Sequence, residues 1–277
     1  MPALFDRQWS LQVDTLDLSD LDLAFKVERS VWRTPNLAEI RVWNLSETTR
    51  SEIQRRETVV LRAGYEDPPT LFRGDIRRVW TETDGIDLVT VLQARDGGRA
   101  YSEARIARSY NPGTPVLTVL RDVIADMEIG QGNLAEYAAA YALRNGADTF
   151  GDGYVAAGPA RRVLDALTRA AGLRWSVQNG ALQLLRQGTP LQTRAVLLTS
   201  DTGLLDSPTW DERGIRTEGR RGLLTARALI QPGIEPGRKV RVESRLVEGD
   251  FEVRKIQYQG ETRGDPWDAV LEMRPIS

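Results

Sequence analysis

Carboxylates, Lys and Tyr are the side chains left for chemistry in this chain, because its 277 residues include no His and no Cys. This absence excludes Ser-His-Asp and Cys-His catalysis, disulfides, and metal sites built from imidazole or thiolate. A pair of Asp or Glu residues could still act as the acid and base of a glycosidase. The candidates Glu28, Glu39, Asp75 and Asp250 show no spacing that would pair them. We therefore predict no catalytic residue, no bound metal and no cofactor.

Two glycine-rich stretches resemble ligand-binding loops only in outline. Residues 130–135 fit a loose G-x-G-x-x-A pattern, but they follow a predicted helix, whereas a dinucleotide fingerprint follows a strand. We interpret this stretch as a helix break. Residues 151–156 lack a convincing strand before them, and Asp148 and Asp152 lack the spacing of a calcium loop.

The seven Trp residues are another possible source of function. Most lie in predicted strands, where we expect them to anchor a core or an interface. Stacking against carbohydrate is the alternative. These residues are Trp9, Trp32, Trp43, Trp80, Trp175, Trp210 and Trp267.

The charge balance argues against nucleic-acid binding, because the net charge is −2 and such binders usually carry a basic excess. Lys occurs only at Lys26, Lys239 and Lys255, so Arg supplies the rest of the 37 basic residues. Arg is favoured at protein interfaces, although a GC-rich genome would give the same bias. No apolar run approaches the ~20 residues of a membrane span, and the first ten residues lack a signal-peptide core. We expect a protein made in the cytoplasm and soluble until it assembles.

The elements that would position these residues change in kind along the chain. Alternating apolar and polar residues predict five or six strands between residues 8 and 105, with one helix, capped by Ser46, through Arg56. Asp84-Gly85 and Asn179-Gly180 are typical hairpin turns. Between them the patterns predict helices over 114–127, 133–145 and 159–171. From residue 195 onward strand patterns return, with a turn expected at Gly249-Asp250.

These patterns divide the chain into three parts: residues 1–105, residues 106–194 and residues 195–277. The first and last parts share an order of features: a strand, a turn, Gly-Asp opening a second strand, another turn and a third strand. The shared segment is 59–92 in the first part and 240–272 in the last. Either any two β meanders look alike, or the chain holds two related barrels around an α/β insert. We predict the second: a mainly β chain with an α/β insert between two antiparallel β-barrels.

Several stretches outside the insert resemble one known family. They are residues 25–29, 36–40, 42–46, 61–66, 71–76, 96–97, 232–237, 240, 243–244 and 260–267. In these stretches the sequence resembles the baseplate or tail hub proteins of long-tailed bacteriophages and related contractile injection systems. The resemblance spans most of the chain and is weakest over 106–200.

The resemblance implies a structural virion protein of the tail baseplate. It implies that each chain holds two tail-tube-like antiparallel β-barrels and that three chains form a homotrimer. The six barrels would form a pseudo-sixfold ring, joining the sixfold tail tube to a threefold central spike. The expected partners are the tail tube or tube-initiator protein and the spike, with the tape measure and baseplate wedge proteins as further candidates. DNA would pass only transiently through the channel, so we expect a mostly acidic or neutral lumen.

Two other functions stay open at this point. One is a tail-associated, carboxylate-dependent cell-wall hydrolase, and the other is a carbohydrate-binding β module that uses exposed Trp residues. Wall-lysing activity would favour the first, and glycan binding by the isolated monomer would favour the second.

Overall fold

A computed structural model describes residues 6–54, 56–186, 188–191, 194–211, 222–231 and 233–276. The chain forms two compact units. The sheet unit comprises the described residues within Met1–Val31, Asn36–Arg95 and Pro190–Ser277. The insert unit comprises Trp32–Pro35 and the described residues within Asp96–Thr189. Among the stretches that resemble tail hubs, Pro232 lies outside the described residues, as does residue 55 of the first predicted helix.

The N-terminal half of the sheet unit contains the strands that the alternating residues predicted, in the hydrogen-bonded order β3-β4-β7-β6-β5-β1-β2. Every neighbouring pair in this half is antiparallel. The helix α1 begins after Ser46, whose hydroxyl accepts a hydrogen bond from the Thr49 backbone N–H as the capping prediction requires. The elements are β1 (Arg7–Val13), β2 (Leu16–Asp17), β3 (Leu23–Ser30), β4 (Leu37–Trp43), α1 (Glu47–Ile53), β5 (Thr58–Tyr65), β6 (Thr70–Asp84) and β7 (Asp87–Arg95).

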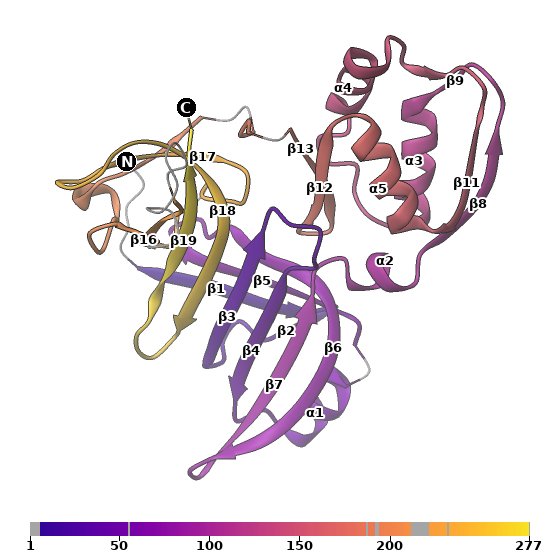
Figure 1. Ribbon diagram of the computed structural model, residues 1–277. Coiled ribbons are helices and arrows are strands. Elements are labelled where there is room, and N and C mark those ends of the chain that lie inside the picture. Colours follow the sequence, from indigo (N-terminus) through magenta and orange to yellow (C-terminus); the bar gives the residue numbers. More distant parts are fainter. Residues whose placement is uncertain are drawn as a thin grey trace. The chain divides into compact units, whose positions relative to one another are not determined.

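The C-terminal half continues the same sheet, because β18 pairs with β3 as well as with β19 and β17. The order beyond β18 is β19-β16-β15, and β14 pairs with β17 in parallel. Figure 1 shows β18 and β19 as long neighbouring strands next to β3. The elements are β14 (Val196–Leu198), η1 (Ser200–Thr202), β15 (Thr209–Trp210), β16 (Leu224–Leu229), β17 (Lys239–Glu243), β18 (Glu248–Glu261) and β19 (Trp267–Pro275).

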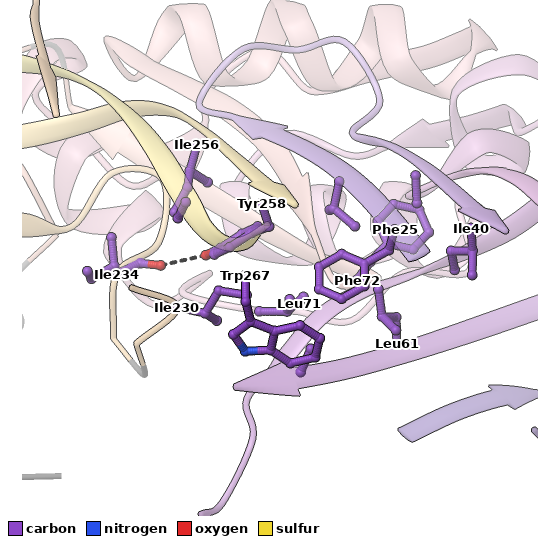
Figure 2. Packing of buried hydrophobic residues seen from close by; sticks show 14 of the residues in the cluster. Phe25, Ile40, Leu61, Leu71, Phe72, Ile230, Ile234, Ile256, Tyr258 and Trp267 are labelled. Carbon is purple, nitrogen blue, oxygen red and sulfur yellow. Dashed lines mark hydrogen bonds between the residues drawn. The ribbon is translucent and has the colours of Figure 1, made fainter. Parts of the chain in front are cut away.

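The two halves share one hydrophobic core. Phe25 and Phe72 from the first half and Tyr258 and Trp267 from the second belong to one cluster of buried side chains (Figure 2). The Tyr258 hydroxyl donates to the Ile234 carbonyl at 2.7 Å, so its polar atom is satisfied inside the core. Because the sheet and the core are both continuous, the two halves form one compact unit. The hydrogen bonds between the described strands do not close either half into a ring of strands, so the count of two barrels stays a prediction.

The repeat predicted from the sequence corresponds to two similar three-stranded meanders. β6 and β18 are the central strands, with 15 and 14 residues. Each pairs with the preceding strand through its first residues and with the following strand through the rest. Each also has a β-bulge against the following strand, between Ile76 and Arg78 in β6 and between Val253 and Lys255 in β18. A bulge bends a strand and increases its twist, so both meanders are curved in a comparable place.

Two predicted turns are wrong by a few residues. The first hairpin turns at Gly85-Ile86, because Asp84 still pairs with Asp87. Gly249 and Asp250 lie inside β18, where they pair with Val242 and Arg241. The turn is at Ser244–Val247 instead, where the Ser244 side chain accepts from the Val247 N–H and its backbone N–H donates to the Val247 carbonyl. A turn held by a Ser side chain needs no glycine. The prediction followed the Gly-Asp pair, a common turn sequence, and so missed the actual turn.

The insert unit contains most of the predicted α/β segment 106–194, but it begins at Asp96, ends at Thr189 and includes Trp32–Pro35. It is built around its own core. The helices α3, α4 and α5 pack with a hairpin that turns at Asn179-Gly180, as expected. Two further strand pairs, β8 with β11 and β9 with β10, were not predicted. The elements are α2 (Gly98–Ser102), β8 (Arg105–Tyr110), β9 (Thr114–Pro115), α3 (Val116–Asp126), α4 (Glu136–Asn145), β10 (Thr149–Phe150), β11 (Tyr154–Pro159), α5 (Ala160–Ala170), β12 (Leu173–Gln178) and β13 (Ala181–Arg186).

The glycine motif of the insert is a packing feature. Gly130 exchanges backbone hydrogen bonds of 2.8 Å with Gly180 and Leu182, and Gly132 has a φ of +54°. A Cβ on Gly132 would lie 1.6 Å from the Leu182 carbonyl oxygen, so no side chain fits there. The motif holds the segment after α3 against β13, which accounts for the two glycines without any ligand.

We expect Gly132→Ala to lower the free energy of unfolding of the insert unit by about 2–4 kcal/mol, from strain at positive φ together with the clash. Gly146→Ala is the matched control in the same unit, because Gly146 also has a positive φ, +76°, but a Cβ at this position would have no atom within 4 Å. Its expected cost is about 1 kcal/mol. Urea unfolding of both variants measures the difference, and equal losses would show that the contact with Leu182 is unimportant.

Candidate assembly surface

The outward face of the first half of the sheet carries two rows of polar residues. The register aligns Lys26 of β3 with Glu39 of β4 and Gln93 of β7. The next outward row contains Glu28, Leu37 and Arg95 from the same strands. The alternate residues of these strands face the core, because side chains along a strand point to opposite sides.

These two rows, together with Ala38, Ala94 and Arg77 of β6, line a groove of about 410 Å³, which we call the β3–β4–β7 groove. Its carboxylates are already partnered, since Glu28 is 3.0 Å from Lys255 and Glu39 accepts from Gln93 at 3.1 Å. Lys26 and Arg95 are exposed and form no ion pair with any described residue. Leu37 is 47% exposed on the same face. The groove therefore has two cations available to a partner beside an exposed apolar side chain.

A free strand edge lies beside this groove. β5 pairs with β6 only as far as Asp75, and the Ile76 N–H donates to the Glu57 carbonyl at 2.7 Å. From Arg78 to Asp84, no described strand other than β7 pairs with β6. An unpaired edge can accept a further strand, and charged residues along it usually prevent unwanted pairing.

The side chains along this edge are held in place by one another. The Arg78 guanidinium lies 4.9 Å from the centre of the Trp80 ring, and Trp80 Nε1 donates to Glu82 at 3.2 Å. Glu82 also forms an ion pair of 2.5 Å with Arg41 of β4. At the end of the hairpin, Ile86 is fully exposed at 101% of its reference area. The hairpin extends past its neighbouring strands (Figure 1), so this edge is an ordered, accessible surface.

The opposite end of this half of the sheet is acidic. β2 is the last strand there, and Asp17, Asp20 and Asp22 lie within or directly after it. Asp17 and Asp20 are exposed, while Asp22 forms an ion pair with Arg263. The Ser19 hydroxyl and backbone N–H donate to Asp17 and lower the pKa of its carboxyl below the usual value. This acidic edge therefore carries charge opposite to that of the β3–β4–β7 groove.

The carboxylates considered for catalysis are distributed over structural contacts. The fold brings Glu28 and Glu39 onto neighbouring strands of the groove, and it places Asp75 opposite Arg95. Asp250 lies on β18, where a hydrogen bond from Lys239 at 2.5 Å lowers the pKa of its carboxyl. Salt bridges such as these favour the charged carboxylate, whereas a general acid has to be protonated. The absence of a catalytic residue stays a prediction.

The other sequence candidates are spread through the fold. Trp175 and Trp267 are buried, Trp32 is 42% exposed, and the remaining Trp residues are partly buried. Across the described part of the chain, no group of three acidic residues is placed to hold a metal ion. No helix of the described residues is both long and apolar enough to cross a membrane.

Sequence reasoning did not single out Lys26, Leu37 or Arg95. The alternation in 21–28 and 37–45 was visible and showed that these side chains face outward. It could not show that they meet, because the strand register is set by contacts far apart in sequence. The free edge of β6 had no sequence signal beyond the unusual length of its strand.

A family described as Baseplate hub gp41 matches residues 10–272. The match covers both halves of the sheet unit and the insert unit. No curated protein matches the sequence.

Solved structures share the fold at low identity. The prophage MuSo2 43 kDa tail protein of Shewanella oneidensis has a TM-score of 0.66 and 9% identity, with 98% of each chain covered. A tail protein of Neisseria meningitidis MC58 has a TM-score of 0.65 and 11% identity, over 98% of this chain and 97% of that one. The E. coli c3393 protein has a TM-score of 0.58 and 11% identity, over 96% and 77%. It is described as a component of the type VI secretion system with structural similarity to the T4 tail proteins gp27 and gp5.

The resemblance noted in the sequence is thus confirmed by a family match over nearly the whole chain, and two tail proteins share its fold. The chain belongs to the baseplate hub gp41 family, whose members are structural proteins of the phage tail.

Proposed function

We propose that three copies of this chain form a closed ring in the tail baseplate, which joins the tail tube to the central spike and surrounds the DNA channel. The ring assembles in the host cytoplasm and becomes part of the virion. Its contacts are with the tail tube or tube-initiator protein on one side and the spike on the other, with the tape measure and wedge proteins as further candidates. The chain acts without catalysis.

The observation that carries this proposal is the pair of bulged meanders in one chain. β5-β6-β7 and β17-β18-β19 repeat the same strand order, the same long central strand and the same type of bulge. A chain with two similar β units presents six of them when three copies assemble around a threefold axis. Such a ring matches sixfold symmetry on one side while keeping threefold symmetry on the other.

The charge of the described surface supports a passive conduit. Several charged side chains of the sheet unit away from the β3–β4–β7 groove are paired with opposite charges, such as Arg241 with Glu248 and Lys239 with Asp250. The whole chain carries a net charge of −2. A near-neutral wall would let DNA slide, whereas a continuous belt of Arg would bind its phosphates.

We expect the purified protein to have a mass three times that of the 31.0 kDa chain in native mass spectrometry, across a range of protein concentrations. Electron microscopy of the same sample should show a ring with a central opening. A stable monomer at high concentration would contradict the ring. Lysis of cell walls that a single acidic substitution abolishes without changing the mass would contradict the non-catalytic role.

A further inference from the structure

We infer that the β3–β4–β7 groove and the free edge of β6 receive the acidic edge of a second copy of this chain. The inference rests on the proposed ring and assigns two of the surfaces through which its subunits meet. The basic side consists of Lys26, Arg95 and the backbone of Arg78–Asp84. The acidic side consists of Asp17 and Asp20, at and just after β2.

The basic side carries positive charges that form no ion pair within the described residues. Both carboxylates of the groove already have a partner, Glu28 through Lys255 and Glu39 through Gln93. Lys26 and Arg95 are exposed and make no ion pair within the described residues. The groove lining holds three cations, Lys26, Arg77 and Arg95, against two carboxylates, so a carboxylate from another molecule would meet a net positive charge. Exposed charge pairs between two proteins mainly orient the partners and speed their association. The exposed Leu37 side chain adds apolar area to the same surface.

The free edge of β6 would set the orientation of the bound segment. The backbone N–H and C=O groups of β6 from Arg78 onward have no partner strand on one side among the described residues. An extended segment lying there would pair with the edge and align its side chains with the neighbouring groove. The ordered contacts among Arg78, Trp80 and Glu82 mean that this edge loses little freedom when a partner binds.

The acidic edge suits this place by charge and by position. Asp17 and Asp20 are exposed, and the hydrogen bonds from Ser19 lower the pKa of the Asp17 carboxyl. β2 has only two residues and is the last strand on this side, so its outer edge has no partner strand among the described residues. Because the two surfaces lie at different strands of the same sheet, each copy can use one surface toward each neighbour. Such a head-to-tail contact is what a closed ring requires.

A charge-swap experiment tests the inference. Lys26→Glu with Arg95→Glu reverses the basic side, Asp17→Lys with Asp20→Lys reverses the acidic side, and a third variant combines all four substitutions. We expect each double variant to need a roughly hundred-fold higher protein concentration to reach half assembly, because like charges then face each other. The fourfold variant should regain most of the assembly of the natural sequence. The measurement is native mass spectrometry over a concentration series, at the same ionic strength for all samples.

Matched controls separate local effects from assembly. Arg161→Glu with Arg162→Glu reverses two exposed charges on α5 and should leave assembly unchanged. Two milder variants guard against misfolding. Lys26→Gln with Arg95→Gln removes the two positive charges without reversing them, and Asp20→Lys alone leaves the hydrogen-bonded Asp17 in place. Thermal melts of all variants show whether each one folds.

The outcomes distinguish the two proposals. A natural chain that is monomeric at every concentration would overturn the ring and the inference together. A trimeric natural chain whose assembly neither double variant weakens would leave the ring intact and overturn the inference. Loss in the basic variant without loss in the acidic variant, or no recovery in the fourfold variant, would overturn the acidic edge as occupant.

Discussion

Replacing Glu252 by Gln is expected to lower the free energy of unfolding of the sheet unit by about 3–5 kcal/mol. The Glu252 side chain is completely buried on β18. Its two oxygens accept from Arg254 at 2.9 Å and from Arg274 at 2.6 Å. Arg274 lies directly opposite on β19, and Arg254 occupies the bulge of β18. Without the negative charge, the buried Arg254 guanidinium keeps the cost of leaving water and loses the carboxylate that offsets it.

The matched control is Glu248→Gln on the same strand. Glu248 is 69% exposed and pairs with Arg241 at 2.8 Å, so its loss is expected to cost less than about 1 kcal/mol. The double variant Glu252→Met with Arg254→Met should recover most of the lost stability, because it removes both buried charges together.

Urea unfolding at one fixed protein concentration is the appropriate measurement, since urea does not screen charges and assembly adds a concentration-dependent term. Hydrogen exchange of β17, β18 and β19 locates the effect. A Glu252→Gln variant no less stable than Glu248→Gln would show that the buried cluster does not stabilise the second meander.

Replacing Asp96 by Ala is expected to lower the free energy of unfolding of the insert unit by about 3 kcal/mol. Asp96 is fully buried, and its carboxylate accepts from the backbone N–H groups of Asn179 at 2.6 Å and Gly180 at 2.8 Å. These are the two turn residues of the β12–β13 hairpin. Alanine leaves both donors without the charged acceptor that now satisfies them.

Asp96→Asn should fall between Ala and the natural residue, because it keeps one acceptor oxygen without the charge. Asp148→Ala, at an exposed position of the same unit, should change stability by less than about 0.5 kcal/mol. Hydrogen exchange of β12 and β13 reports the loss directly. Unchanged protection of this hairpin in Asp96→Ala would contradict the role assigned to the carboxylate.

The Asp96-Gly97 pair shows that a resemblance to a family can include a residue without indicating its contacts. The pair was one of the stretches that resembled tail hubs, and by sequence alone it had no stated role. In the structure the first residue holds a hairpin that lies more than eighty positions further along the chain. Gly97 has a φ of +64° and precedes α2, a conformation that glycine adopts without strain.

Local signals in the sequence determined the element types and most of their ends. The Ser46 cap, the helices ending near Met127 and Ala171, and the Asn179-Gly180 turn were all predicted and are present. Each depends on interactions within a few residues, such as capping, helical periodicity and the positive φ of the turn. The paired strands β8 and β11 were missed because their Arg, Ala and Gly residues do not alternate like a half-buried strand.

Only the tertiary structure decided which strands meet. β3 and β18 come from opposite ends of the sequence, yet they join the two halves into one sheet and one core. The same holds for the groove, where Lys26, Leu37 and Arg95 come together through the pairing of three strands. The alternation of apolar and polar residues shows which face of a strand is outward. The same alternation is compatible with many neighbouring strands and registers. The choice among them comes from long-range packing of the core, and no local pattern records it.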